Sequence, residues 1–84
     1  MNTMSVTVRD RRTVSPWALV TRTVQIGTHC PECGGLRGQP RSSHYCEDGQ
    51  HYWVDNWENP CGHVDYYDDV LEEAEALVRA AQER

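Results

Sequence analysis

Polar and apolar residues alternate along the first third of the chain, and this pattern predicts two β-strands. The first covers Ser5 to Asp10, and the second covers Trp17 to Ile26, directly after Pro16. Side chains of a strand point to opposite faces in turn, so apolar residues two positions apart share one face. Only Arg22 interrupts the apolar face of the second segment. The two segments are expected to pair as a hairpin whose apolar face carries Val6, Val8, Ala18, Val20, Val24 and Ile26.

A second hairpin is predicted further along the chain, over Tyr45–Trp57. Asp48 and Gly49 lie near its middle, and Asp-Gly is a preferred pair for a two-residue hairpin turn. The strand after this turn is rich in aromatic and β-branched residues, which are common in strands. Residues 27–43, before the hairpin, contain several glycines and two prolines and are expected to form turns and loop.

Helical spacing replaces alternation in the last part of the chain. Apolar residues recur every three or four positions, and acidic residues gather before them. Acidic side chains stabilise the first turn of a helix, where the helix dipole is positive. The pattern predicts a helix from Asp65 or Asp68 to the C-terminus, with an apolar stripe that packs against the strands rather than binding a partner. The stripe consists of Val70, Leu71, Ala74, Leu77, Val78 and Ala81.

These elements predict one small α+β domain over residues 1–84, made of two β-hairpins and a C-terminal amphipathic helix. Its parts are an N-terminal hairpin in residues 1–27, a loop and second hairpin in 28–64, and the helix in 65–84. A chain of this length buries only about 60–65% of the surface that its unfolded form exposes. The chain also contains no Phe. Its apolar core is therefore small, and its four cysteines are expected to help hold the fold.

The role of the cysteines depends on the compartment. Residues 1–28 contain no apolar run of the length that a secretory signal needs, and no later segment is apolar enough to span a bilayer. The sequence thus predicts a cytoplasmic protein without a membrane partner. Thiols stay reduced in the cytoplasm, where closely spaced cysteines favour a metal over a disulfide. All eight basic residues are Arg, a bias that suggests a GC-rich coding sequence such as those of actinobacteria or their phages.

Charge is divided unevenly between the two halves of the chain. Residues 1–41 carry six Arg and two acidic residues, a balance of +4, whereas residues 42–84 carry two Arg and eleven acidic residues, a balance of −9. A net acidic protein is a poor general ligand for phosphate backbones. The charge is expected mainly to keep a small protein in solution.

The strongest chemical signal is the run Cys30-Pro31-Glu32-Cys33-Gly34-Gly35. A C-x-x-C turn places two thiolates within reach of one metal ion, at about 2.3 Å from each sulfur. The glycine after the second cysteine permits a positive φ there. Thioredoxin-like redox pairs share this spacing but belong at the start of a helix. The glycines and Pro40 that follow Cys33 oppose a helix, so the run predicts a metal-binding turn.

A tetrahedral zinc ion needs two further ligands. Cys61 is the best third ligand, because it lies in a second compact turn, Pro60-Cys61-Gly62-His63. The fourth ligand is predicted to be His63, with Cys46 as a nearly equal alternative. An all-cysteine site favours Cys46, but the predicted hairpin places Cys46 across from His51 near the tip, about 30 Å of straight strand from Cys61, as a buried strand residue. The other histidines are expected at the surface, and these are His29, His44 and His51.

Aromatic and acidic residues are concentrated in Tyr52–Trp57. Trp53 and Trp57 share one face of the predicted strand. Aromatic side chains on such a face either bind bases or protein partners, or fill a core. The absence of Phe favours the core interpretation. Trp53 and Trp57 nevertheless remain candidate partner-binding residues, together with Arg11 and Arg12 from the basic half of the chain.

The CPECGG run, together with the later NPCGH, resembles the two metal-holding turns of zinc-ribbon domains. The likeness covers about residues 28–64 and departs where a ribbon normally carries a second C-x-x-C. The whole chain is also similar to short zinc-binding proteins of actinobacteria. The resemblance implies a small zinc-stabilised fold with one structural Zn²⁺, held by Cys30, Cys33, Cys61 and either His63 or Cys46.

Zinc ribbons serve many roles, so the resemblance implies a scaffold rather than an activity. A zinc ion with four protein ligands has no open position for catalysis, and we expect no enzyme and no small-molecule substrate. The favoured function is a protein-interaction or regulatory module that binds another protein. The alternatives are a nucleic-acid-binding ribbon and a thiol-based redox or zinc sensor. A nucleic-acid-binding ribbon would use as phosphate contacts Arg9, Arg11, Arg12, Arg37 and Arg41.

Overall fold

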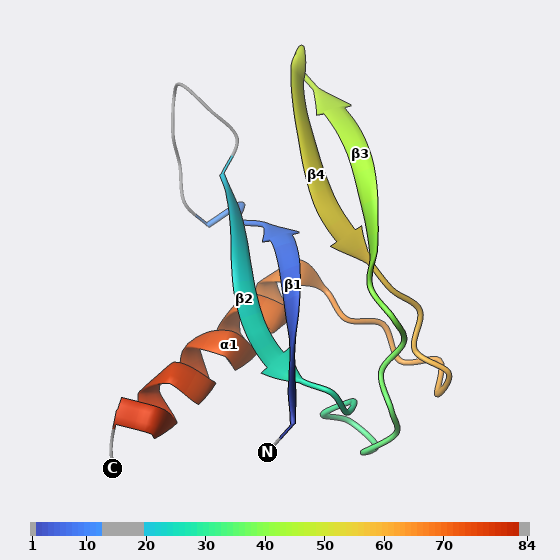
Figure 1. The fold of residues 1–84 in the computed structure, drawn as a ribbon, viewed down its shortest axis with the longest axis vertical. Helices are drawn as coiled ribbons and strands as arrows, with labels where there is room; N and C mark the ends of the chain where they lie inside the picture. The colour runs from blue at the N-terminus through green and yellow to red at the C-terminus, as the bar shows by residue number, and fades with distance from the viewer. Residues whose placement is uncertain (1, 13–19, 83–84) are drawn as a thin grey trace.

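The computed structural model describes residues 2–12 and 20–82. Within these residues, two antiparallel hairpins stand side by side, and a helix crosses one face of the first hairpin (Figure 1). The long connections that follow each hairpin lie together at one end of the molecule (Figure 1). In chain order the elements are β1 (Thr3–Arg9), β2 (Thr21–Gly27), β3 (Arg41–Glu47), β4 (Gln50–Asn56) and α1 (Tyr67–Gln82).

β1 and β2 form the predicted first hairpin, in a register that places Val6 opposite Val24. β1 begins earlier than predicted, and residues 17–19 of the predicted second strand lie outside the described part of the chain. The apolar face that alternation predicts is confirmed for this hairpin, because Val6, Val8 and Ile26 are completely buried.

β3 and β4 form the predicted second hairpin around Asp48-Gly49. Both turn residues have positive φ, 51° and 76°, as a type I′ turn requires. The expectation of loop up to residue 43 is wrong, since β3 already begins at Arg41. Ser43 lies opposite the buried Val54, so the partner strand, rather than the local sequence, makes this segment extended.

α1 begins at Tyr67, between the two predicted starts, and its first half packs on the first hairpin. Its second half continues past the edge of β2 (Figure 1). There Val78 is 56% exposed, so the interpretation of the whole stripe as core is wrong for its C-terminal part. No helix of the described residues is long and apolar enough to cross a lipid bilayer. The core consists of Val6, Val8, Ile26, Val70, Leu71 and Ala74, with Met4, Val24, Trp57 and Tyr67 packed against it.

Side chains, rather than strand pairing, join the two hairpins in the described part of the chain. Asp55 of β4 accepts a hydrogen bond from the backbone N–H of Thr7 in β1, at 2.7 Å. Nearer the tip, Arg9 forms an ion pair with Glu47 and lies 5.4 Å from the ring centroid of Tyr52. The hydrogen bond from Arg9 lowers the pKa of Glu47 below its usual value. The backbone of β1 is thus satisfied by an acidic side chain where a neighbouring strand is lacking.

Removing the Asp55 acceptor leaves the Thr7 N–H without its partner at a partly buried position. We expect Asp55→Ala to lower the free energy of unfolding by about 1–3 kcal/mol. Asp55→Asn keeps an acceptor oxygen and is expected to lose clearly less. Urea denaturation followed by circular dichroism, at constant zinc, measures both variants. Equal losses would show that the hydrogen bond does not link the hairpins.

Candidate metal centre

The loop after β2 forms the first metal-binding turn. A short antiparallel bridge opens and closes the loop, and inside it the Cys30 N–H donates to the Gly35 carbonyl at 2.7 Å. The Gly34 N–H donates back to the Cys30 carbonyl at 2.8 Å, and Gly34 has a φ of 76°. These bonds hold the Cys30 and Cys33 sulfurs within 4.8 Å of each other.

The second turn follows β4 and carries Cys61. The Gly62 N–H donates to the Asn59 carbonyl at 2.9 Å and closes a turn over Pro60 and Cys61. Gly62 has a φ of 84°, a conformation that glycine adopts without strain. The second turn lies directly against the first, because a Cβ added to Gly35 would stand only 3.6 Å from the Cys61 Cβ.

The two turns bring together four possible ligands, which are Cys30, Cys33, Cys61 and His63. One ligand atom from each lies within 4.8 Å of every other. Around a tetrahedral zinc ion, two thiolates at 2.3 Å stand about 3.8 Å apart. Cys30 is buried and the other three are exposed. Three sulfurs and one imidazole form a group that can hold one metal ion.

Thiol ionisation is uneven within this group. Burial raises the pKa of Cys30, but hydrogen bonds from the backbone of Glu32 and Cys33, helped by Cys61, outweigh it and lower that pKa. The backbone of Gly35 lowers the pKa of Cys33, yet the neighbouring sulfurs and burial together raise it above its usual value. Peptide N–H groups thus favour the thiolate form of Cys30, whereas the neighbouring sulfurs disfavour that of Cys33.

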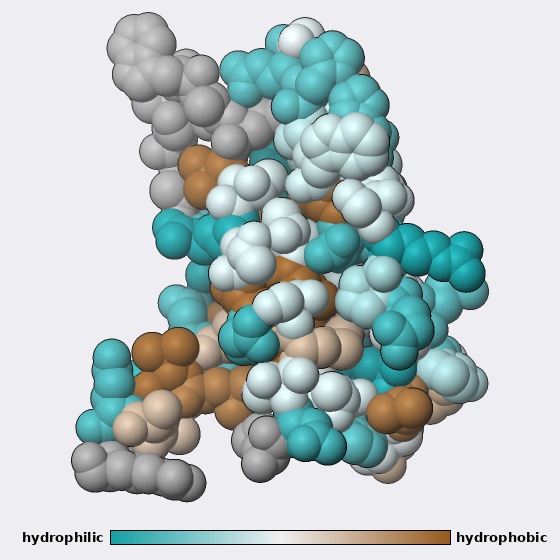
Figure 2. Space-filling model, viewed as in Figure 1, coloured by the Kyte–Doolittle hydropathy of each residue, from teal (hydrophilic) through white to brown (hydrophobic). Residues whose placement is uncertain are grey.

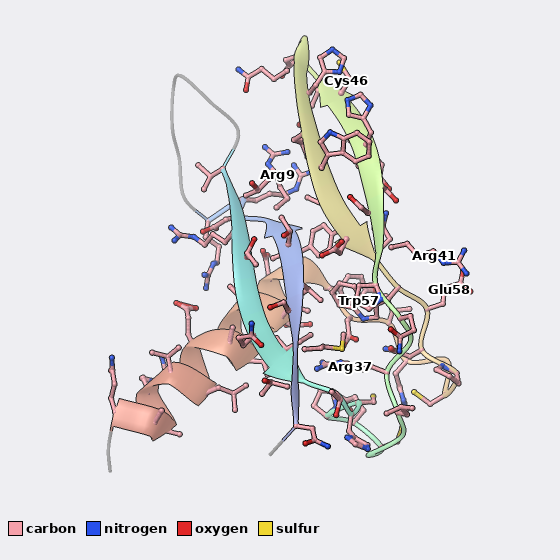
Figure 3. All side chains as sticks on the ribbon, in the orientation of Figure 1. Arg9, Arg37, Arg41, Cys46, Trp57 and Glu58 are labelled. Atoms are coloured by element: carbon pink, nitrogen blue, oxygen red, sulfur yellow. The ribbon has the colours of Figure 1, made fainter. Side chains whose placement is uncertain are left out.

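Cys46 lies outside this group. The register places it opposite His51 near the tip of the second hairpin, at the other end of the molecule (Figure 3). The expectation of a buried strand residue is wrong, because Cys46 is exposed. This face of the hairpin points away from the core rather than into it. The remaining histidines, His29, His44 and His51, are exposed as expected.

Arg37 connects the metal-binding turns to the rest of the fold (Figure 3). It is only 4% exposed, so the expectation that it contacts phosphate is wrong. Its guanidinium makes bidentate pairs with Asp65, at 3.0 Å twice, and with Glu73, at 3.0 and 2.8 Å. It also donates to the Gly27 carbonyl at 2.8 Å, so all five N–H groups are used. Burial opposes its charge, but Glu73 and Asp65 raise the pKa of Arg37 above its usual value.

Asn59 links the two loops directly. Its Oδ1 accepts from the Gly38 N–H at 3.1 Å, and its Nδ2 donates to the His63 carbonyl at 2.8 Å and to Asp65 at 2.9 Å. Only glycine fits at position 38, since a Cβ there would lie 1.9 Å from the Glu58 carbonyl oxygen. Close backbone approach and one amide side chain thus hold the loops in contact.

The two candidate tryptophans have different environments. Trp57 packs against the core and donates from Nε1 to Asp65 at 2.8 Å, in line with the core interpretation. Trp53 is 60% exposed and does not belong to the core. The periodicity could not separate them, because Trp57 lies beyond the end of β4 and turns toward the helix.

Acidic side chains engage several of the arginines considered as phosphate contacts. Arg9 pairs with Glu47, and Arg12 donates to Glu75 at 2.7 Å. Arg11 is exposed, and its Nη1 lies 3.9 Å from Oε1 of Glu47, the residue that also pairs with Arg9. Together with the burial of Arg37, these pairs engage four of the five arginines considered as phosphate contacts.

Comparison with known proteins gives no relatives for this chain: no protein-family model, no curated protein and no solved structure matches it. The interpretation of the site therefore depends on its own geometry and chemistry.

Replacing Arg37 by an apolar residue of similar length leaves the Asp65 and Glu73 carboxylates facing each other without their cation. We expect Arg37→Met to lower the free energy of unfolding by about 3–5 kcal/mol. Arg41→Met is the matched control, because Arg41 is exposed and should change stability by less than about 0.5 kcal/mol. Denaturant unfolding in zinc-containing buffer measures both. Similar losses for the two variants would contradict the role assigned to Arg37.

Proposed function

We propose that this chain is a zinc-ribbon-like domain in which Cys30, Cys33, Cys61 and His63 hold one structural Zn²⁺. The observation that carries the proposal is the meeting of four sulfur and imidazole donors from two glycine-containing turns. Thiolate-rich tetrahedral sets are typical of structural zinc, and four protein ligands leave the ion no open position. The proposal therefore assigns the metal to folding and gives the domain no catalytic role.

A metal is well suited to this end of the molecule. In the described part of the chain, the hydrophobic core consists of six buried residues between α1 and the first hairpin, and the metal-binding loops lie outside it. Few apolar contacts are available to order these loops, and a small domain commonly compensates with a metal or disulfides. Binding free energy at such a site contributes directly to folding.

Chelation tests the structural role. We expect native mass spectrometry to find one tightly held zinc per chain after excess metal is removed. Chelator should release it, with loss of the cooperative unfolding transition seen by circular dichroism. Cys61→Ser should behave like the chelated protein, whereas Cys46→Ser should keep its tightly held zinc. A chain that folds identically without metal would contradict a structural site.

The proposed role of the domain is to bind another protein, and a groove beside β2 supports this. The groove has a volume of about 1100 Å³ and lies between β2 and the C-terminal half of α1. Its helical wall includes Leu77 and the exposed Val78. Figure 2 shows apolar surface at this end of the molecule, at the lower left.

The strand wall of the groove offers backbone hydrogen bonds. The Asp10 N–H donates to the Val20 carbonyl. In β2, the backbone N–H and C=O groups of the even-numbered residues therefore point toward β1. The backbone groups of Thr23 and Gln25 consequently face the groove. No strand of the described residues pairs with this edge. An open strand edge beside an apolar helix is the arrangement that binds extended peptides by strand addition.

We assign the groove to an extended segment of a partner protein with apolar and acidic side chains. Its charged lining pairs Arg12 with Glu75 and Arg22 with Asp10, whereas Arg79 makes no ion pair with any described residue. An acidic side chain of the partner would supply that pair. A second copy fits less well, because β2 contains Arg22 and no acidic residue and would add positive charge to this rim.

A defined peptide tests this assignment. The probe is a capped seven-residue peptide that alternates Val and Thr between two terminal Glu. We expect saturable shifts of the Thr23 and Gln25 amide signals in ¹H–¹⁵N spectra below about 1 mM peptide. Val78→Asp should weaken the effect about tenfold or more.

Two control peptides distinguish strand addition from non-specific binding. Methylation of alternate peptide nitrogens removes the donors needed for a ladder, and terminal Lys in place of Glu reverses the charge. Both should bind clearly more weakly. Equal binding of the methylated peptide would contradict strand addition. Concentration-dependent dimers with the same amide shifts, without peptide, would assign the groove to a second copy instead.

A further inference from the structure

A second group of metal-binding side chains lies on the β3–β4 hairpin, remote from the first group. His44 and Cys46 are two residues apart on β3 and therefore share a face. The register places His51 directly opposite Cys46. All three side chains are exposed, and Figure 3 shows Cys46 near the tip of the hairpin. One thiol and two imidazoles thus meet on a single solvent-facing surface.

The distance between Cys46 and His51 is close to the one that a shared metal ion needs. The Cys46 Sγ lies 3.9 Å from the His51 Nε2. Zinc bonds of 2.3 Å to sulfur and about 2.05 Å to nitrogen place two such donors about 3.6 Å apart at a tetrahedral angle. An ion between Cys46 and His51 therefore requires shifts of only a few tenths of an ångström.

The second imidazole is already in contact with the first. The His44 Nε2 lies 3.0 Å from the His51 Nδ1, and the two rings are stacked with centroids 4.9 Å apart. Such a nitrogen–nitrogen contact needs one nitrogen with a proton and one without it. The contact occupies the Nδ1 of His51, while its Nε2 faces Cys46. Binding of one ion by all three side chains requires the His44 ring to turn toward Cys46, which its exposed position permits.

We propose that His44, Cys46 and His51 form a second metal site, which takes a thiophilic transition-metal ion such as Zn²⁺. A thiolate with imidazoles is the donor set that zinc and copper(I) prefer, and it does not suit magnesium or calcium. This site differs from the first in two respects. It offers three protein ligands rather than four, and the hairpin around it is held by strand pairing and a type I′ turn.

An ion in this site keeps an open coordination position toward solvent. Structural zinc sites are closed, whereas three-ligand sites bind water or an external donor in the fourth position. The ion at the hairpin is therefore exchangeable and accessible to a ligand supplied from outside the chain. Loss of the ion leaves the fold intact, because no element depends on it for packing.

Zinc stoichiometry of the full-length chain tests the proposal. Native mass spectrometry during a Zn²⁺ titration should show a second ion per monomer, at free zinc concentrations about tenfold or more above those that fill the first site. Cys46→Ser and His51→Gln should each weaken the affinity of this second step about 100-fold or more. Loss of a side chain that only hydrogen-bonds to a metal ligand already lowers metal affinity about 10–100-fold. His29→Gln is the matched control, because His29 is an exposed histidine outside the group.

A spectroscopic readout locates the second ion. The rings of Trp53 and His44 lie 5.0 Å apart, so Co²⁺ at the hairpin should quench Trp53 fluorescence in the second step of a titration. Trp53→Phe should abolish that quenching without changing the stoichiometry. Cys61→Ser should disrupt the first site and, in any chain that stays folded, keep the hairpin step.

Three results would overturn the proposal. The first is the absence, up to millimolar zinc, of any bound ion that both Cys46→Ser and His51→Gln remove. The second is a second ion that persists in Cys46→Ser with unchanged affinity. The third is a second ion found only in dimers, which would place it between chains. The structural zinc can fail its own chelation test without affecting these outcomes, because the variants differ.

Discussion

One buried arginine determines how the parts of this fold are held together. Arg37 lies in the connection between the hairpins and reaches the end of β2, the loop before α1 and the helix itself. Each of its five N–H groups has an oxygen partner, and each carboxylate is held by two of them. Such an arrangement is stable only as a complete set, since a missing member leaves a buried charge without compensation.

The metal-binding turns take their positions from this arrangement. Asp65 follows His63 by two residues and also accepts from Trp57 and Asn59. These bonds orient the second turn, and the close approach at Gly38 brings the loop of the first turn against it. Arginine suits this role better than lysine, because its planar fork can serve two carboxylates at once.

The sequence predicted those features that depend on local chemistry. Alternation predicted the first hairpin, Asp48-Gly49 and the aromatic strand after it predicted the second, and the CPECGG spacing predicted the first metal-binding turn. Hairpin geometry favoured His63 over Cys46 as the fourth ligand, whereas the number of cysteines favoured Cys46, and the structure places His63 in the group. The choice followed from counting residues along one strand.

Other features could not be predicted, because they depend on contacts between distant segments. An arginine in a glycine-rich loop is expected at the surface, and nothing near Arg37 in the sequence indicates that Asp65 and Glu73 will enclose it. The exposure of the C-terminal half of α1 could not be predicted either, since an apolar stripe has the same sequence pattern whether or not a sheet covers it. The segment that begins at Arg41 is a strand because it pairs with β4, and its own sequence does not indicate this.

Glu73 joins the metal end of the molecule to the groove beside β2. One of its oxygens accepts from the Gly27 N–H at 2.8 Å, and both accept from Arg37. The carboxylate that helps to neutralise the buried arginine therefore also fastens the last residue of β2 to α1, and these two elements are the walls of the groove. Arg12 adds a second tie, since it donates to Glu75 on the same helix at 2.7 Å. Two polar ties thus hold the groove walls together, and one of them belongs to the Arg37 cluster beside the metal-binding turns.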